Sequence, residues 1–169
     1  MNPILKSFNE AAPEYAVTTL LSCCAARRWA ELVASSRPYS NEEALFTEAD
    51  RVWATMQKAD WMEAFRAHPR IGERTPAQAS EQSKAWSSQE QASVHAAHSR
   101  VLDELRTANA HYEELFGFTY IVCATGKSAD EMLGIMQRRL NNDRESELRE
   151  AAEQQRQITQ IRLRKWLQV

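Results

Sequence analysis

The sequence has few of the residues that interrupt helices, with only 4 Gly and 5 Pro among 169 residues. It also has no apolar run near the ~20 residues that are needed to cross a bilayer. Its formal net charge is −2, and no cluster of Lys and Arg stands out along the chain. These absences exclude a membrane-spanning protein and a basic nucleic-acid-binding protein. We therefore expect neither a membrane nor a nucleic acid as a partner.

Cysteine is scarce as well, with 3 residues, of which Cys23 and Cys24 are neighbours and Cys123 stands alone in an apolar run. Adjacent cysteines have poor geometry for a disulfide bond, so we expect three reduced, packed thiols. Met1 to Phe8 contain one lysine and no long apolar core, which does not fit a secretory signal. The last three residues do not form a peroxisomal signal. We therefore expect a cytoplasmic protein.

What is present favours one all-helical domain over residues 1–169. Hydrophobic residues make up 43% and charged residues 26% of the sequence, an ordinary globular balance. Apolar periodicity and capping residues predict helices over about 3–12, 14–35, 41–56, 60–67, 87–116 (with a bend or break near Asn109), 129–140 and 143–167. Ser40 with Glu43, and Ser128 with Glu131, predict two capping boxes. The predicted fold is an all-α bundle of about eight helices.

Two stretches do not follow the helical pattern. Residues 68–82 contain Pro69, Gly72 and Pro76, which predict a loop or a broken helix. Residues 118–124 are β-branched and aromatic, as in a strand, yet the sequence offers no second strand to pair with them. This segment is either a helix imposed by the tertiary structure or one extended, buried segment whose backbone N–H and C=O groups meet a ligand.

Polar residues occur at three places where the pattern predicts an apolar face. At the first, Ser87, Glu90 and Gln91 share one helix face, in phase with Val94 and Val101. A buried carboxylate is costly unless it is paired or hydrogen-bonded, which would indicate a site. The alternative is that Ser87 opens a helix whose first turn extends into water, where Glu90 would complement the helix dipole.

Arg162 and His68 mark the other two places. Arg162 lies in the buried stripe of the last helix, between Ile158 and Trp166, so it either snorkels to solvent or meets an internal anion. His68 directly precedes Pro69, which disfavours helical geometry at the histidine. An imidazole titrates near neutral pH and is the usual proton-transfer group, but a single loop histidine also fits a structural role.

No cofactor or metal motif is complete. Gly126-Lys127-Ser128 resembles the end of a phosphate-binding loop, but Ile121 stands where that loop requires its first glycine. His95 and His98 could share a helix face, but no Cys, His or carboxylate spacing supports a metal site around them. We expect no cofactor and no metal.

Four ordered motifs carry a resemblance to a known family. They are His68-Pro69-Arg70-Ile71-Gly72, Ser87-x-x-Glu90-Gln91, Phe116-Gly117-Phe118-x-Tyr120-Ile121-Val122-Cys123-Ala124 and Ile161-Arg162-Leu163. In this order, together with Arg37-Pro38-Tyr39-Ser40 near the start, they resemble the 2-oxo-4-hydroxy-4-carboxy-5-ureidoimidazoline (OHCU) decarboxylases. The resemblance spans nearly the whole chain.

The resemblance implies an all-α, cofactor-independent decarboxylase that converts a small molecule, OHCU, to (S)-allantoin at the end of urate oxidation. It assigns His68 and Glu90 to catalysis, with His68 as the proton carrier. It assigns the remaining site residues to substrate binding: the side chains of Ser87, Gln91 and Arg162, the adjoining Pro69, and the backbone of Tyr120, Ile121, Val122, Cys123 and Ala124. Many relatives have an arginine where this chain has Thr125, a difference that bears on the rim of the pocket.

Two other functions stay open from the residues alone. A non-enzymatic helical interaction module would use Trp61, Trp86 and Trp166 as solvent-exposed anchors and would have no buried site. A ring-opening hydrolase of ureides would need a group that activates water, and the sequence shows no ligand set for a metal. The sequence does not indicate an oligomeric state, and a homodimer is compatible with it.

Overall fold

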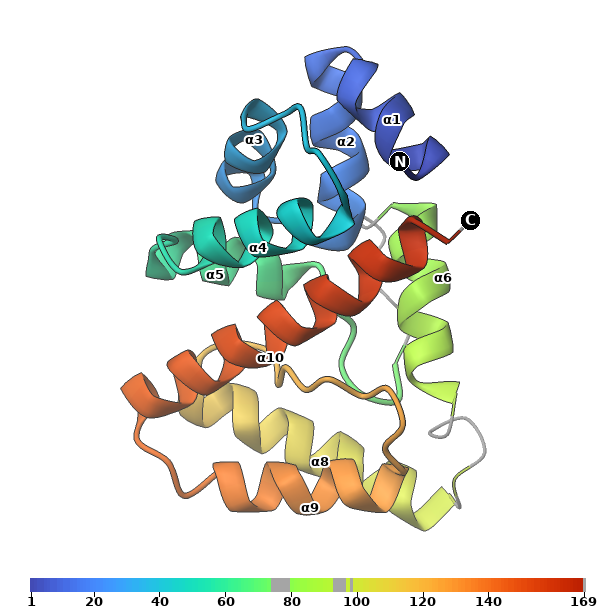
Figure 1. Ribbon diagram of the computed structural model, residues 1–169. Coiled ribbons are helices and arrows are strands. Elements are labelled where there is room, and N and C mark those ends of the chain that lie inside the picture. The colour runs from blue at the N-terminus through green and yellow to red at the C-terminus, as the bar shows by residue number, and fades with distance from the viewer. Residues whose placement is uncertain (74–79, 93–96, 98, 169) are drawn as a thin grey trace. The chain divides into compact units, whose positions relative to one another are not determined.

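The computed structural model describes residues 1–73, 80–92, 97 and 99–168. Within these ranges the chain forms nine helices and no strand, which confirms the all-α prediction (Figure 1). The helices are α1 (Pro3–Glu10), α2 (Pro13–Cys23), α3 (Arg27–Ser35), α4 (Glu42–Trp53), α5 (Lys58–Arg66), α6 (Glu81–Glu90), α8 (Ser99–Phe116), α9 (Ala129–Arg139) and α10 (Arg144–Trp166).

Internal contacts divide the chain into two compact units. Unit 1 comprises Met1–Ala64 and Arg156–Val169, and unit 2 comprises Phe65–Gln155. Each unit has buried apolar residues of its own, such as Trp29 in unit 1 and Tyr112 in unit 2. The prediction of a single domain over residues 1–169 stays a prediction.

Two predictions for unit 1 are wrong in detail. The helix predicted over 14–35 is two helices, because Cys24 takes an extended backbone conformation (φ −146°, ψ 120°) between α2 and α3. Apolar periodicity could not reveal this break, since the residues on both sides of it are buried. The N-cap of α4 is Asn41 and not Ser40: the Asn41 side chain accepts a backbone N–H bond at 2.9 Å. Both residue types are good N-caps, so the pattern did not distinguish a shift of one residue.

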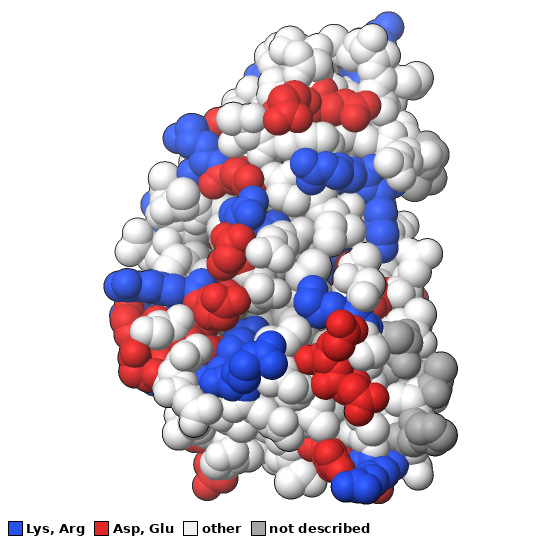
Figure 2. Space-filling model, turned by 60° about the horizontal axis from the view of Figure 1, so that its bottom comes forward, with Lys and Arg blue, Asp and Glu red and all other residues white. Residues whose placement is uncertain are grey.

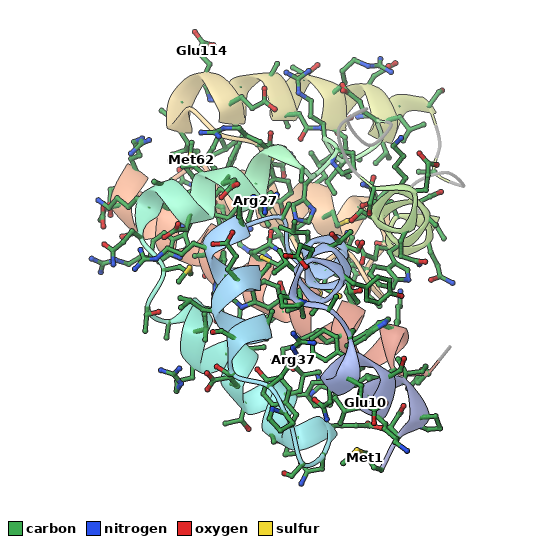
Figure 3. The ribbon with its side chains drawn as sticks, turned by 90° about the horizontal axis from the view of Figure 1, so that it is seen from above. Met1, Glu10, Arg27, Arg37, Met62 and Glu114 are labelled. Carbon is green, nitrogen blue, oxygen red and sulfur yellow. The ribbon has the colours of Figure 1, made fainter. Side chains whose placement is uncertain are left out.

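Arg37 has a structural role in unit 1. Its guanidinium donates hydrogen bonds to the carbonyl oxygens of Phe8 at 2.6 Å, Ala11 at 2.9 Å and Ala34 at 2.8 Å. Carbonyl groups at helix ends lack intrahelical partners, and these three lie at the ends of α1 and α3. Arg37, labelled in Figure 3, therefore links the ends of two helices. The motif that begins with it stabilises the fold.

In unit 2, the prediction of one long helix over 87–116 is wrong. Helix α6 ends at Glu90, because Gln91 leaves helical geometry (φ −98°, ψ 18°), and α8 is a separate helix. Helix α8 then continues through Asn109 without the predicted interruption. The Asn109 side chain donates to the Ile71 carbonyl oxygen at 3.0 Å, so it does not compete with the backbone bonds of its own helix.

Helices α8 and α9 lie side by side in unit 2 and are joined by residues 117–128 (Figure 1). Gly117 ends α8 with a positive φ of 79°, which favours glycine. The predicted capping box at the start of α9 is confirmed. The Glu131 N–H donates to Ser128 Oγ at 3.1 Å, and the Ser128 N–H donates to the Glu131 carboxylate at 2.7 Å.

The described helices include none that combines the length and the apolar character needed to span a membrane. On the face shown in Figure 2, acidic and basic side chains of the described residues are interspersed with one another. That face has no broad positive surface of the kind that binds nucleic acid.

Candidate active site

His68 lies just after α5 and outside helical geometry, as Pro69 predicts. Its N–H donates to the Phe65 carbonyl oxygen at 3.1 Å, its side chain is half-buried, and Pro69 is buried. Ring atom Nε2 of His68 lies 2.7 Å from Oε1 of Gln155, a fully buried residue of α10. The imidazole is therefore held in one direction, as a proton-transfer group must be.

Ser87, Glu90 and Gln91 lie at the C-terminal end of α6. Ser87 is 3% and Gln91 6% exposed, and Glu90 is half-buried. The alternative in which Ser87 opens a helix into water is therefore wrong. Because Glu90 is the last residue of α6, its carboxylate lies at the negative end of the helix dipole, which does not favour it. The placement of Glu90 needs a reason other than helix stabilisation.

Gln91 connects this face to the loop that follows His68. Its Oε1 accepts a hydrogen bond from the Gly72 N–H at 3.0 Å. Gly72 has a φ of 87°, a conformation that residues with a Cβ rarely adopt. From α8, Asn109 holds the Ile71 carbonyl oxygen of the same loop. Two of the four motifs, the one from His68 to Gly72 and the one from Ser87 to Gln91, thus meet in unit 2.

The segment over residues 118–124 is almost entirely buried and is neither helical nor paired in a strand. Figure 1 shows it as non-helical chain between α8 and α9, so the helical alternative is wrong and the prediction of an extended, buried segment is confirmed. Its contact with a ligand stays a prediction. Side chains bind its backbone in place of a partner strand: Arg139 donates to the Ile121 oxygen at 2.7 Å, Gln154 accepts from the Cys123 N–H at 2.8 Å, and Lys127 donates to the Cys123 oxygen at 2.7 Å.

Two backbone N–H groups of the same segment have no acceptor among the described residues. Val122 and Ala124 are each 5% exposed, and their N–H groups donate to no residue in the described part of the chain. Buried N–H groups nearly always have an acceptor. These two N–H groups are therefore exceptions within the described part of the chain.

A buried charged network supports the segment. The Glu147 carboxylate is 0% exposed and accepts hydrogen bonds from Arg139 Nε at 2.7 Å, Asn142 Nδ2 at 2.9 Å and the Tyr112 hydroxyl. The Arg139 guanidinium also lies over the Tyr120 ring, 4.8 Å from its centre. Burial alone would lower the pKa of Arg139, but its bond to Glu147 raises that pKa overall, so the guanidinium stays charged.

Sequence reasoning missed four residues that position this site: Arg139, Glu147, Gln154 and Gln155. A signal for Arg139 was present, because it continues the apolar face of α9 that Met132 and Met136 define. This is the same kind of misplaced polar residue that indicated Arg162. Gln155 likewise falls within the apolar stripe of α10.

Arg162 belongs to unit 1 and is 4% exposed, so the interpretation that it snorkels to solvent is wrong. It lies close enough to Cys23 and Cys24 for its charge to favour their thiolates. Burial is the larger effect, and it raises the pKa of Cys23 to about 12 and that of Cys24 to about 11. All three cysteines are buried and none forms a disulfide bond, as expected. The role of Arg162 in substrate binding stays a prediction.

Consecutive residues of α10 bring two further parts of the predicted site together. Gln155 holds the His68 ring, and Gln154 holds the backbone at Cys123. His68 and the 118–124 segment therefore bind to the same turn of one helix. Within unit 2, side-chain bonds thus connect three of the four motifs. Gln154 is 31 residues from Cys123 in the sequence, and Gln155 is 87 residues from His68.

Other features of the described residues lie away from these motifs. A surface groove of about 720 Å³ lies along α8 and α9 and includes Asp103, Thr107, Leu133 and Gln137, but none of the predicted site residues. No group of three or more His, Cys, Asp or Glu side chains among the described residues is arranged to hold a metal. His95 and His98 lie outside the described residues.

Comparison with known proteins gives a consistent result. The family model for OHCU decarboxylase matches residues 9–164. The uric acid degradation bifunctional protein TTL of Arabidopsis thaliana is 33% identical over 144 residues, which are 85% of this chain and 44% of that protein. The 2-oxo-4-hydroxy-4-carboxy-5-ureidoimidazoline decarboxylase of Haloferax volcanii is 28% identical over 135 residues, 79% of this chain and 77% of that protein. The chain thus spans less than half of the Arabidopsis protein and most of the Haloferax protein.

Two solved structures are similar. A crystal structure of OHCU decarboxylase in the presence of (S)-allantoin matches with a TM-score of 0.78 and 30% identity, over 94% of this chain and 100% of that one. A crystal structure of (S)-allantoin synthase matches with a TM-score of 0.71 at 16% identity, over 96% of this chain and 53% of that one, which shows a shared fold. Because the family model covers most of its length, this chain belongs to the OHCU decarboxylase family.

Proposed function

We propose that this chain decarboxylates OHCU to (S)-allantoin in urate degradation. The observation that carries the proposal is the convergence in unit 2 of His68, the Ser87-to-Gln91 face and the 118–124 segment through Gln91, Gln154 and Gln155. Membership of the family supports the same conclusion.

The substrate explains why no electron-accepting cofactor is expected. OHCU has a carboxylate and a hydroxyl group on one ring carbon, next to a C=N carbon that bears the ureido group. When the bond to CO₂ breaks, its electron pair enters the ring, and the C=N nitrogen takes a proton from solvent. The hydroxyl proton then leaves as the ring carbonyl forms, and the ureido-bearing carbon gains a proton. The protein needs to orient the carboxylate out of the ring plane and to deliver that last proton to one face.

In this proposal His68 is the acid–base group. After CO₂ has left, it accepts the hydroxyl proton as the ring carbonyl forms and delivers a proton to the ureido-bearing carbon, which sets the stereochemistry. Glu90 binds ring or ureido N–H groups of the substrate. Ser87 and Gln91 complete the polar wall, and Pro69 limits the space beside the ring.

In the proposal, the buried segment over residues 118–124 binds the substrate through its backbone. Its backbone from Tyr120 to Ala124 would bind the ring and ureido edges, which fits the donors at Val122 and Ala124 that the described residues leave without acceptors. We expect Arg162 to contact a carbonyl oxygen that gains charge in the transition state. A tight grip on the departing carboxylate would stabilise the ground state and slow the reaction.

The interaction-module alternative has no support in the structure. It required Trp61, Trp86 and Trp166 as solvent-exposed anchors, but Trp86 is 6% exposed and the other two are half-buried. The hydrolase alternative stays without a supporting observation.

Circular dichroism of freshly generated OHCU tests the proposed function. With the purified chain, the circular dichroism signal of a single allantoin enantiomer should appear rapidly. Comparison with authentic (S)-allantoin identifies that enantiomer. Without protein, slow decay should give racemic product. An unchanged decay rate with racemic product would refute the proposal. The cytoplasmic location stays a prediction that cell fractionation tests. The homodimer stays a prediction that light scattering tests.

A further inference from the structure

We propose that Gln155 is a positioning residue that holds His68 in the tautomer protonated at Nε2, so that the lone pair for proton transfer is on Nδ1. The inference rests on the proposed function for its catalytic consequence. Its structural part concerns the free protein and can be tested without substrate.

The assignment follows from the chemistry of the contact. Oε1 of Gln155 lies 2.7 Å from Nε2 of His68. In the amide orientation that the structure gives, Oε1 of Gln155 faces Nε2. An amide oxygen can only accept a hydrogen bond, so in this orientation Nε2 carries the proton. A neutral imidazole has one protonated nitrogen, which leaves the lone pair on Nδ1. When His68 is charged, Nε2 keeps its bond to Gln155, and the proton that is exchanged is the one on Nδ1.

Gln155 is a polar residue in an otherwise apolar, buried part of α10. Its side chain is 0% exposed and lies in a stripe of α10 whose other members include Ala151, Ala152 and Ile158. An apolar residue there would bury surface without the cost of desolvating an amide. Retaining a glutamine is reasonable where its oxygen orients another group.

Gln155 lies on a more regular element than His68 does. His68 lies in non-helical chain after α5. Gln155 lies inside a helix of 23 residues. Its neutral amide orients the ring without adding a charge, whereas a carboxylate would stabilise the imidazolium and make it a weaker acid. An acid–base group that must both accept and return one proton is better served by the neutral partner.

The decisive measurement is the ¹⁵N NMR spectrum of the wild-type protein labelled at histidine, at a pH where His68 is neutral. Long-range ¹H–¹⁵N correlations distinguish a protonated ring nitrogen from one with a lone pair. We expect the Nε2-protonated tautomer for His68. The opposite tautomer would overturn the inference, and this measurement needs no variant that could fail to fold.

Two substitutions test the role of the amide oxygen. Gln155→Leu should give a mixture of tautomers and lower kcat by about 10- to 100-fold, the range seen when a metal-binding histidine loses its orienting partner, with KM changed less than kcat. Gln155→Glu keeps an acceptor at the same place and should restore the Nε2-protonated tautomer. If Gln155→Leu folds and keeps both the tautomer and kcat, the inference is wrong.

Gln154→Leu is the matched control, because it removes the neighbouring amide that binds the Cys123 N–H. It should keep the His68 tautomer and raise KM. A change of the His68 tautomer in this control would show that general disturbance of α10 explains the result and would overturn the inference. If the wild-type chain does not decarboxylate OHCU, the proposed function fails, whatever tautomer is found.

Discussion

At the scale of single residues, the proposed chemistry depends most on His68. His68→Ala should lower kcat by about 10²–10⁴-fold, because it removes the proton-transfer group. The measurement is the rate of (S)-allantoin formation by circular dichroism. His111→Ala is a suitable control, since His111 is an exposed histidine on α8. Wild-type rates for His68→Ala would show that another group transfers the proton.

Glu90 allows a test in which activity and stability change in opposite directions. Glu90→Gln keeps the shape of the side chain and removes a negative charge from the C-terminal end of α6. That charge is unfavourable to the helix by about 0.3–1 kcal/mol, so the variant should be as stable as the wild type or slightly more stable in urea. Its kcat should nevertheless fall by about 10²-fold or more, if Glu90 acts in catalysis. Unchanged kcat and KM would reduce Glu90 to a charge at a helix end.

At the scale of the elements, the extended segment depends on the ion pair between α9 and α10. The Arg139 guanidinium is 2.5 Å from the Glu147 carboxylate, and their side chains are 7% and 0% exposed. Arg139→Met would leave the Glu147 carboxylate buried without its cation, which costs about 3–5 kcal/mol. Urea unfolding should show this loss, and KM for OHCU should rise because the Ile121 carbonyl oxygen loses its donor.

The control for this prediction is Arg138→Met, which removes an exposed arginine from the same helix turn. It should change the free energy of unfolding by less than about 0.5 kcal/mol. Equal destabilisation by the two substitutions would mean that the buried pair does not support the segment.

At the scale of the whole molecule, the buried thiols and phenols predict alkaline sensitivity. Burial raises the pKa of Cys23 and Cys24 from 9.0 to about 12 and about 11. Well below pH 9 both thiols are protonated in the folded and the unfolded state, so their contribution to stability is fully present. As the pH rises from about 9 towards these raised values, only the unfolded chain ionises freely, and the free energy of unfolding falls. Above pH 10, Tyr39, Tyr112 and Tyr120 add to this loss, because burial also raises the pKa of each phenol.

Urea unfolding between pH 7 and pH 11 measures this effect. We expect little change up to about pH 8.5, the ordinary pKa of a thiol, and a progressive loss above it. A double variant with Cys23→Ala and Cys24→Ala should lose less stability between pH 9 and pH 10 than the wild type does. Identical slopes for the two proteins would show that these thiols do not govern the transition.

The sequence predicts helices where apolar periodicity and capping residues mark them. It does not predict where a helix breaks within a continuous pattern. Ser128 and Glu131 lie three residues apart and cap α9 as their spacing indicates. The break at Cys24 and the end of α6 at Glu90 both fall inside regular apolar or polar patterns. Such ends depend on where the chain must turn to pack, which a pattern on either side does not contain.

The candidate site shows the same division. The sequence by itself identified candidate site residues, because a polar residue on an apolar helix face, as at Ser87, Arg139 or Arg162, has an energetic cost that requires a reason. Only the tertiary structure decided which of these groups meet. A helical period reports which face is buried, but not which distant residue lies against it, and the contact between His68 and Gln155 spans 87 residues of sequence.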